Sequence, residues 1–121
     1  MSEPFRLLIT GSRDWEDEES VRFEIAGMTM LHPGLVVVHG ACPTGADAMA
    51  AKACADIGVR QEPHPADWDA YGRAAGPRRN AEMVALGADA CFAWIKDGSR
   101  GASHCAGLAE KAGIPVMRFT A

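Results

Sequence analysis

Hydrophobic positions along the chain follow two alternating patterns. Short, nearly continuous apolar runs occur at residues 7–9, 35–38 and 91–95. Runs of this kind are typical of parallel strands that are covered on both faces. Between the runs, apolar residues recur at helical spacing, most clearly over residues 46–57, where they line one face of a helix. The alternation predicts an α/β fold.

The same patterns predict five strands and four helices in strict alternation. We expect strands at residues 7–9, 35–38, 59–64, 89–95 and 115–119, and helices at residues 16–31, 46–57, 77–87 and 103–112. Gly58 is the expected C-terminal stop of the second helix. Pro77 is expected to open the third helix, where its missing N–H costs least, and residues 65–76 are expected to form a long loop.

Right-handed crossovers restrict such a chain to a doubly wound, Rossmann-like parallel sheet with helices on both faces. Residues 59–64 are polar for a strand, so we place them at an edge and predict the order 3-2-1-4-5. No composition shift or repeat divides the chain, and residues 1–121 are expected to form a single domain. Ligands of such sheets bind beyond the carboxyl ends of the strands, at the point where the strand order reverses. In the predicted order this switch point lies between strands one and four.

Three loops rich in glycine and serine each follow a strand and precede a helix. They comprise residues 11–13, 40–45 and 97–101. Together they gather backbone amides and helix N-termini at one edge of the sheet, which predicts an anion-binding pocket for a nucleotide, a phosphorylated nucleoside derivative or a phosphorylated sugar. The ligand-binding residues expected there are Gly11, Ser12, Arg13, Trp15, Gly40, Thr44, Gly45, Asp47, Trp68, Arg78, Arg79, Asn80, Gly98, Ser99, Arg100 and Gly101.

Four of these residues are arginines. Arg78 and Arg79 fall in the first turn of the predicted third helix, where the helix macrodipole disfavours a cation unless an anion lies nearby. Arg13 and Arg100 occupy the two loops at the predicted ligand site, and a guanidinium can bind phosphate through two parallel hydrogen bonds. The alternative is that these arginines pair with surface aspartates.

Other candidates also admit a structural role. Thr44 and Asp47 resemble a helix capping box with Asp in place of Glu; the functional alternative is that Thr44 contacts phosphate or ribose and Asp47 accepts a ribose hydroxyl. The tryptophans Trp15 and Trp68 either stack on a base or pack the loops. A role in proton transfer is open for His39 and His104.

Composition narrows the function further. The chain has 12 Lys and Arg against 16 Asp and Glu, a formal charge of -4, which argues against a general nucleic-acid-binding surface. It has no apolar segment of membrane-spanning length and no signal-like N-terminus, so a cytoplasmic protein that does not contact the membrane is expected. The four cysteines lack metal-site spacing; we expect them to be reduced and predict no metal or other cofactor.

Four motifs appear in order at residues 11–15 (GSRDW), 39–47 (HGACPTGAD), 64–68 (HPADW) and 76–80 (GPRRN). With them the sequence resembles the YspA/YpsA-related branch of the SLOG superfamily, the Rossmann-like group that includes the LOG phosphoribohydrolases and DprA. The resemblance covers nearly the whole chain. It implies a nucleotide-related ligand and a homodimer.

LOG enzymes hydrolyse the N-glycosidic bond of nucleoside 5′-monophosphates with a Pro-Gly-Gly-x-Gly-Thr-x-x-Glu loop and a helix arginine. Residues 97–105 resemble that loop, with Cys105 in place of the glutamate. A carboxylate can stabilise an oxocarbenium-like transition state and position water, and cysteine does neither well. If the protein is an enzyme, Arg79 and Asp47 are the candidate catalytic residues, with Arg78 and Asp14 as alternatives.

Three functions therefore remain. The favoured one is a nucleotide-binding protein that acts as a sensor or sequesters a nucleotide-derived signal. The alternative is a LOG-like hydrolase of nucleoside 5′-monophosphates. DprA-like binding of single-stranded DNA is disfavoured by the acidic charge balance.

Overall fold

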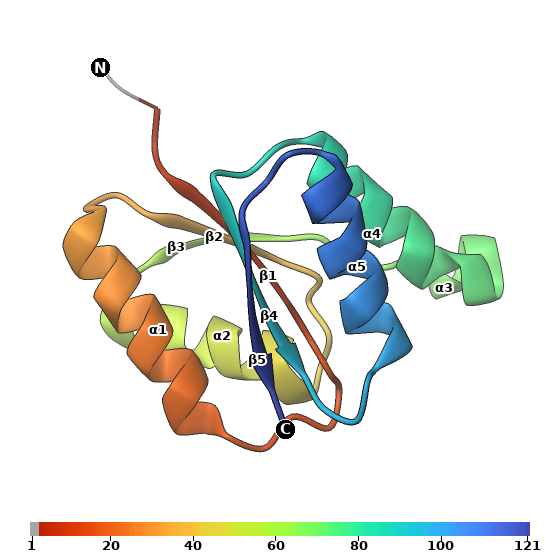
Figure 1. The fold of residues 1–121 in the computed structure, drawn as a ribbon, viewed down its shortest axis with the longest axis horizontal. Coiled ribbons are helices and arrows are strands. Elements are labelled where there is room, and N and C mark those ends of the chain that lie inside the picture. Colours follow the sequence, from red (N-terminus) through yellow and green to blue (C-terminus); the bar gives the residue numbers. More distant parts are fainter. Residues whose placement is uncertain (1–2) are drawn as a thin grey trace.

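Five parallel strands form one sheet in the order β3-β2-β1-β4-β5 (Figure 1). The computed structural model describes residues 3–121. The strands are β1 (Arg6–Gly11), β2 (Val36–His39), β3 (Arg60–Pro63), β4 (Ala90–Ile95) and β5 (Val116–Thr120). The predicted α/β class and strand order are confirmed, including the position of the polar strand β3 at an edge.

Four long helices cover the sheet: α1 (Glu18–Leu31), α2 (Gly45–Ile57), α4 (Ala75–Ala85) and α5 (Arg100–Lys111). In Figure 1, α1 and α2 lie on one face of the sheet and α4 and α5 on the other. Asp17 caps α1, accepting a hydrogen bond from the backbone N–H of Ser20 at 3.2 Å. Gly58 ends α2 in the left-handed conformation, at a φ of 88°, as its position in the sequence predicts.

Strand β1 shows why the central strands are apolar without interruption. Leu7 and Ile9 pack with residues of α1 and α2, whereas Leu8 packs with residues of α4 and α5. All three side chains are fully buried. Because side chains alternate between the two faces of a strand, a sheet covered on both faces needs apolar residues at every position.

The segment between β3 and α4 differs from the prediction. Residues 65–76 were expected to be a loop, but they contain the short helix α3 (Trp68–Tyr71) and a 3₁₀ turn, η1 (Gly72–Ala74). The carboxylate of Asp67 caps α3 by accepting a hydrogen bond from the N–H of Ala70 at 3.0 Å. A side-chain cap therefore starts a helix that is too short to show periodicity.

The starts of α4 and α5 also differ from the prediction. Pro77 is the third residue of α4 rather than its first; the missing N–H is still harmless there because the first-turn amides have no partner within the helix. Arg79 consequently lies in the second turn rather than the first. Helix α5 begins at Arg100 rather than Ser103, with Ser99 as its N-cap residue. The third glycine loop is thus shorter than expected.

Candidate functional site

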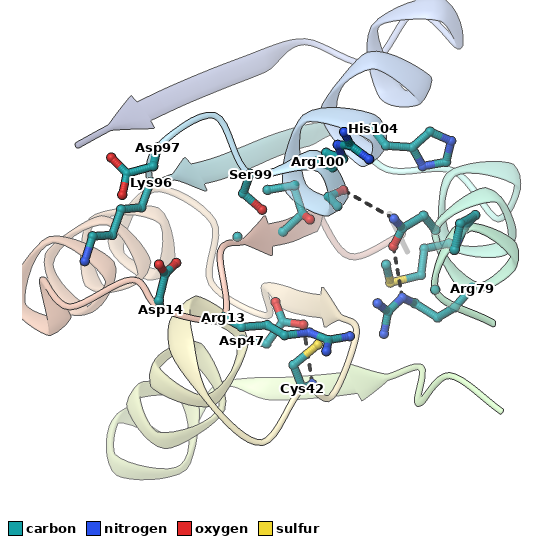
Figure 2. A pocket seen from close by; sticks show the side chains of 18 of the residues that line it. Arg13, Asp14, Cys42, Asp47, Arg79, Lys96, Asp97, Ser99, Arg100 and His104 are labelled. Carbon is teal, nitrogen blue, oxygen red and sulfur yellow. Dashed lines mark hydrogen bonds between the residues drawn. The ribbon is translucent and has the colours of Figure 1, made fainter. Parts of the chain in front are cut away.

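A pocket of about 750 Å³ opens at the carboxyl ends of β1 and β4, the place that the sheet topology predicts. Figure 2 shows side chains from the loops after β1, β2 and β4 and from α4 and α5 around it. Nine of the predicted ligand-binding residues line it: Gly11, Arg13, Asp47, Trp68, Arg79, Asn80, Ser99, Arg100 and Gly101. Seven others do not: Ser12, Trp15, Gly40, Thr44, Gly45, Arg78 and Gly98.

Ser12 joins the two strands that flank the pocket instead of lining it. It is buried, and its Oγ accepts a hydrogen bond from the backbone N–H of Lys96 at 2.8 Å. Its own N–H donates to the carbonyl of Trp94 at 2.8 Å. These two bonds fix the β1 loop against the end of β4, and Arg13, the next residue, projects into the pocket.

Two glycines of the second loop allow close packing. A Cβ on Gly45 would collide with the carbonyl oxygen of Ser12 and would lie 2.6 Å from the Cα of Arg13. A Cβ on Gly40 would lie 2.5 Å from Nη1 of Arg79 and 2.9 Å from Oδ2 of Asp47. Both glycines therefore bring chain segments together behind the pocket.

Thr44 and Asp47 do not form the capping box that their spacing suggests. Thr44 is the N-cap residue of α2, but its side chain makes no capping hydrogen bond. The Oδ2 atom of Asp47 instead faces the preceding loop, where the backbone N–H of Cys42 lies 3.5 Å away. The carboxylate of Asp47 thus faces the loop that precedes α2 and does not cap the helix.

Asp47 is buried in the wall of the pocket. Only 5% of the residue is exposed, and within residues 3–121 its Oδ1 atom has no hydrogen-bond partner. Burial raises the pKa of its carboxyl group, while His39, the Cys42 thiol and Arg79 oppose that rise. The site therefore contains a carboxylate with one unused acceptor atom.

Arg79 lies near Asp47, with both side chains against Gly40, and it is held by polar groups of three segments. Its Nη1 donates to the carbonyl of Gly40 at 2.5 Å and to that of His64 at 3.5 Å, and its Nε donates to Oδ1 of Asn80 at 2.9 Å. Asn80 in turn donates to the carbonyl of Gly101 at 3.4 Å. The guanidinium is thus fixed in position by α4 itself and the loops after β2 and β3.

Arg78 lies apart from Arg79. Its guanidinium stands 4.0 Å from the centre of the Tyr71 ring, and it does not line the pocket. Arg13 does, and it stands 5.2 Å from the centre of the Trp68 ring. Each arginine therefore packs on an aromatic ring of the short helix α3, an arrangement in which a cation is attracted to the ring face.

The N-terminus of α5 forms the side of the pocket nearest β4. Ser99, Arg100, Gly101 and Ala102 line it, and the Ser99 side chain makes no capping hydrogen bond. The first N–H groups of a helix have no partner within it and carry partial positive charge. Asp97 and Gly98 precede them with positive φ angles of 51° and 63°, which turns the chain from β4 into the helix.

Three residues considered from the sequence have other places. Trp15 is buried in the core on the α1 and α2 face, and its Nε1 donates to the carbonyl of Asp17 at 3.0 Å. Both ring nitrogens of His39 are engaged, Nδ1 by the N–H of Ala41 at 3.0 Å and Nε2 by the Gln61 side chain at 2.9 Å. Cys105 is fully buried in the core beside α4, where burial raises the pKa of its thiol.

The pocket also has lining residues outside the predicted ligand-binding set: Thr10, Asp14, Cys42, Gly76, Pro77, Met83, Lys96, Asp97, Ala102 and His104. Two of these residues, Lys96 and His104, could have been placed at the site from the sequence. Lys96 is the first residue after β4, and His104 is one helical turn beyond Arg100. Residues that follow a central strand, or share a helix face with a loop residue, belong to the same edge of the sheet.

The described part of the chain gives no sign of a metal centre or a membrane span. Nowhere in residues 3–121 do three His, Cys, Asp or Glu side chains lie close enough together to hold a metal ion. No helix in this range is long and apolar enough to cross a membrane. All four cysteines are free.

Comparison with known proteins agrees with the fold and the motifs. The chain is 46% identical over 122 residues to the Gene 61 protein of Mycobacterium phage D29, covering 94% of this chain and 95% of that protein. Among solved structures it is similar to the Moco carrier protein from Chlamydomonas reinhardtii, with a TM-score of 0.72 and 17% identity over 98% of this chain and 78% of that one. Residues 5–71 match the model of the YspA, cpYpsA-related SLOG family. The chain therefore belongs to the YspA, cpYpsA-related SLOG family.

Proposed function

We propose that this protein binds a nucleotide, or a phosphorylated ligand derived from one, at the carboxyl ends of its central strands. The observation that carries the proposal is the convergence of Arg13, Arg100 and the uncapped N-terminus of α5 on one pocket. Helix N-termini bind phosphate through free N–H groups, and an arginine adds charge and paired donors. In Figure 2, Ser99 and Arg100 lie on one side of the pocket and Arg13 on the other.

The rest of the pocket supports a ligand with an apolar part as well. Met83, Pro77 and Trp68 contribute apolar surface to the wall. The volume of about 750 Å³ lies within the range usual for small-molecule sites. A nucleotide combines an anionic group with a flat, largely apolar base, and it matches this division of the pocket.

The likeness to a solved structure supports the same class of function. The Moco carrier protein, whose fold this chain shares, is by name a carrier of Moco. This likeness favours small-molecule binding by this fold. The choice of a nucleotide rests on the pocket.

Hydrolysis of a nucleoside 5′-monophosphate is the second candidate, and Asp47 is the observation in its favour. Asp47 and Arg79 line the same pocket, so a carboxylate and an arginine are both available there. The position that resembles the LOG glutamate offers no such group, because Cys105 is fully buried in the core. The pocket accordingly supports binding more strongly than catalysis.

The test is a calorimetric titration of the purified protein with AMP, ADP, ADP-ribose and ribose 5-phosphate. We expect at least one of them to bind, and we expect Arg100→Ala to weaken that binding roughly tenfold, since a charge-assisted hydrogen bond contributes about 1.5–3 kcal/mol. Chromatography of the same mixtures would detect free base. We expect none; base release that Asp47→Asn abolishes would establish the hydrolytic candidate instead.

Arg60→Ala is the matched control. Arg60 is exposed on β3 and lies outside the pocket, so its removal changes the net charge equally without touching the site. If Arg60→Ala weakens binding as much as Arg100→Ala, the effect is a general electrostatic one and the α5 site is wrong. If none of the four compounds binds at millimolar concentration, the proposed function fails.

A further inference from the structure

The carboxylate of Asp47 has one acceptor atom that the described part of the chain leaves unused. Its Oδ2 lies 3.5 Å from the backbone N–H of Cys42, whereas the Oδ1 atom is buried and has no hydrogen-bond partner among residues 3–121. A buried acceptor without a donor is destabilising. Because Asp47 lines the pocket, a ligand is the natural source of the missing donor.

The surroundings of Asp47 restrict what that donor is. A Cβ on Gly40 would lie 2.5 Å from Nη1 of Arg79 and 2.9 Å from Oδ2 of Asp47, so the guanidinium and the carboxylate lie against the same glycine. The positive charge of Arg79 disfavours a cationic ligand group at this point. The carboxylate itself disfavours a phosphate. A neutral hydrogen-bond donor is repelled neither by Arg79 nor by Asp47.

In a nucleotide the neutral O–H donors belong to the sugar. The sugar connects the phosphate to the base, so a nucleotide held by its phosphate at the N-terminus of α5 carries its hydroxyl groups into the interior of the pocket. Asp47 enters that interior from α2, on the far side of the pocket from Ser99 and Arg100 (Figure 2). A hydroxyl group also satisfies the carboxylate whatever the base is.

Resting on the proposed function, we propose that Oδ1 of Asp47 accepts a hydrogen bond from a ring hydroxyl of the ligand, so that Asp47 selects ribose phosphates over deoxyribose phosphates. Asp47 is then a specificity-determining residue. The phosphate-binding residues of α5 hold either sugar, and only Asp47 distinguishes them.

The test uses ribose 5-phosphate and its 2-deoxy and 3-deoxy analogues as probes, titrated calorimetrically into the intact protein. We expect at least one deoxy analogue to bind roughly tenfold more weakly than ribose 5-phosphate, because the charged acceptor is then left unpaired. If ribose 5-phosphate fails to bind, or if all three sugars bind within twofold of one another, the inference is overturned. The wild-type protein alone decides this, so the result does not depend on any variant folding.

Substitutions then locate the discrimination. In Asp47→Asn, the amide oxygen takes the place of Oδ2 facing the N–H of Cys42, which leaves a donor where Oδ1 was. We expect the preference for ribose 5-phosphate to fall below threefold in this variant, while Asp56→Asn, an exposed carboxylate on the same helix, keeps the full preference. A preference that persists in Asp47→Asn overturns the assignment to Asp47.

Arg100→Ala separates this inference from the proposed function. We expect it to weaken all three sugar phosphates by the same factor and to leave their ratio unchanged. If AMP binds and depends on Arg100, but ribose and deoxyribose phosphates bind equally, the proposed function stands and the inference about Asp47 fails. A change of the ratio in Arg100→Ala would also count against Asp47 as the selecting residue.

Discussion

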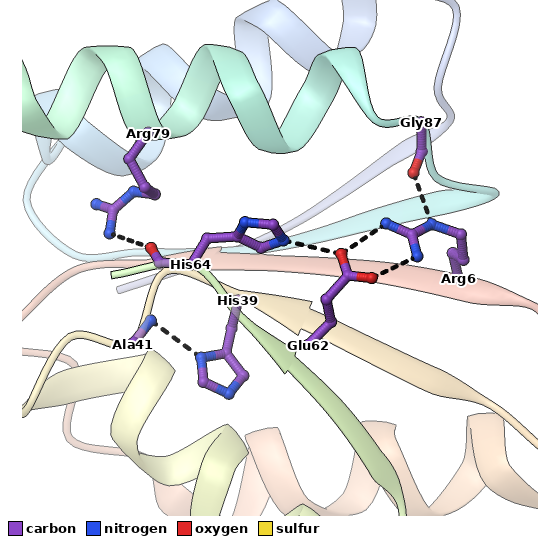
Figure 3. Close-up of polar contacts among 7 residues, drawn as sticks. All are labelled: Arg6, His39, Ala41, Glu62, His64, Arg79 and Gly87. Atoms are coloured by element: carbon purple, nitrogen blue, oxygen red, sulfur yellow. Dashed lines mark hydrogen bonds and ion pairs between the residues drawn. The ribbon is translucent and has the colours of Figure 1, made fainter. Parts of the chain in front are cut away.

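Glu62 of β3 interacts with the side chains of Arg6 and His64 (Figure 3). Its carboxylate accepts hydrogen bonds from both terminal nitrogens of Arg6, at 2.9 and 2.8 Å, and lies 2.8 Å from Nε2 of His64. Arg6 also donates from Nε to the carbonyl of Gly87 at 2.9 Å. The carbonyl of His64 reaches Arg79 in the pocket wall, so this cluster connects the edge strand β3 to the candidate site.

The hydrogen bonds from Arg6 and His64 lower the pKa of Glu62 to about 2, from an ordinary value of 4.5. A carboxyl group whose pKa is lower in the folded state stabilises the fold above its unfolded pKa, and this contribution is lost as the pH falls through the folded value. We therefore expect Glu62→Gln to lower the free energy of unfolding at pH 7 by about 1 kcal/mol or less, because the pair is partly exposed. Urea unfolding of both proteins should show this difference shrinking from pH 4.5 towards pH 2.

Glu110→Gln provides the control for Glu62. Glu110 forms an exposed ion pair with Arg118. Within residues 3–121 it has neither a second partner like His64 nor a bidentate contact, so it should give the smaller difference at pH 7. A difference between Glu62→Gln and wild type that stays constant from pH 7 to pH 2 would contradict the ionic origin of the effect.

At the same scale, the sequence indicates which residues line the pocket better than it indicates the contacts that they make. Arg79, Asp47 and Arg100 stand out from the sequence because each adjoins a glycine-rich loop or a helix start. Whether Asp47 caps α2 or faces the Cys42 loop depends on how closely that loop approaches, and no local pattern encodes this distance. Trp15 is among the ligand-binding residues expected from the sequence, but the structure buries it in the core. Its burial depends on how α1 and α2 pack against the sheet, which no local pattern encodes.

At the scale of elements, the contact between α2 and the loop after β1 depends on a glycine. Gly45 has a φ of +71°, and a Cβ there would collide with the carbonyl of Ser12. Gly58, at the other end of the same helix, has a φ of +88° but no atom within 4 Å of its would-be Cβ. The two positions thus share the backbone strain and differ in packing.

We expect Gly58→Ala to cost about 1 kcal/mol of unfolding free energy, from the left-handed conformation alone. Gly45→Ala should cost about 2–4 kcal/mol, because the collision with the β1 loop adds to the strain. Chemical denaturation of the two variants measures both values. Equal costs would mean that the β1 loop yields easily and that the close approach of α2 has no energetic importance.

Some ends of the helices follow from the local sequence, and others do not. Gly58 ends α2 by a property of its own backbone, and the sequence indicates it directly. The start of α4 at Ala75 was missed because Pro77 is compatible with several positions in a first turn. Helix α3 was missed because four residues are too few to show a helical period, although Asp67 carried a capping signal.

At the scale of the whole molecule, one sheet separates two cores. Ile25 of α1 is fully buried in the core on the α1 and α2 face, together with Trp15 and Trp94. Ile114, which precedes β5, is buried in the core on the opposite face. The strands carry side chains into both cores, so we expect neither half to stay folded without the other. A chain that behaves in this way unfolds as one cooperative unit, as a single domain does.

The test pairs one conservative substitution on each face. Ile25→Val and Ile114→Val should each lower the free energy of unfolding by about 0.5–1.5 kcal/mol, the usual cost of one buried methylene group. Because the sheet lies between the two side chains, the double variant should show the sum within about 0.5 kcal/mol. Two of the three tryptophans, Trp15 and Trp94, are buried in the core on the α1 and α2 face, whereas Trp68 is half-exposed. The fluorescence change on unfolding therefore reports mainly on that face, and far-UV circular dichroism averages over all helices and strands. For a single cooperative unit, Ile114→Val moves the fluorescence transition and the dichroism transition together. If Ile114→Val shifts only the dichroism transition, the two faces unfold separately, and residues 1–121 do not behave as one domain.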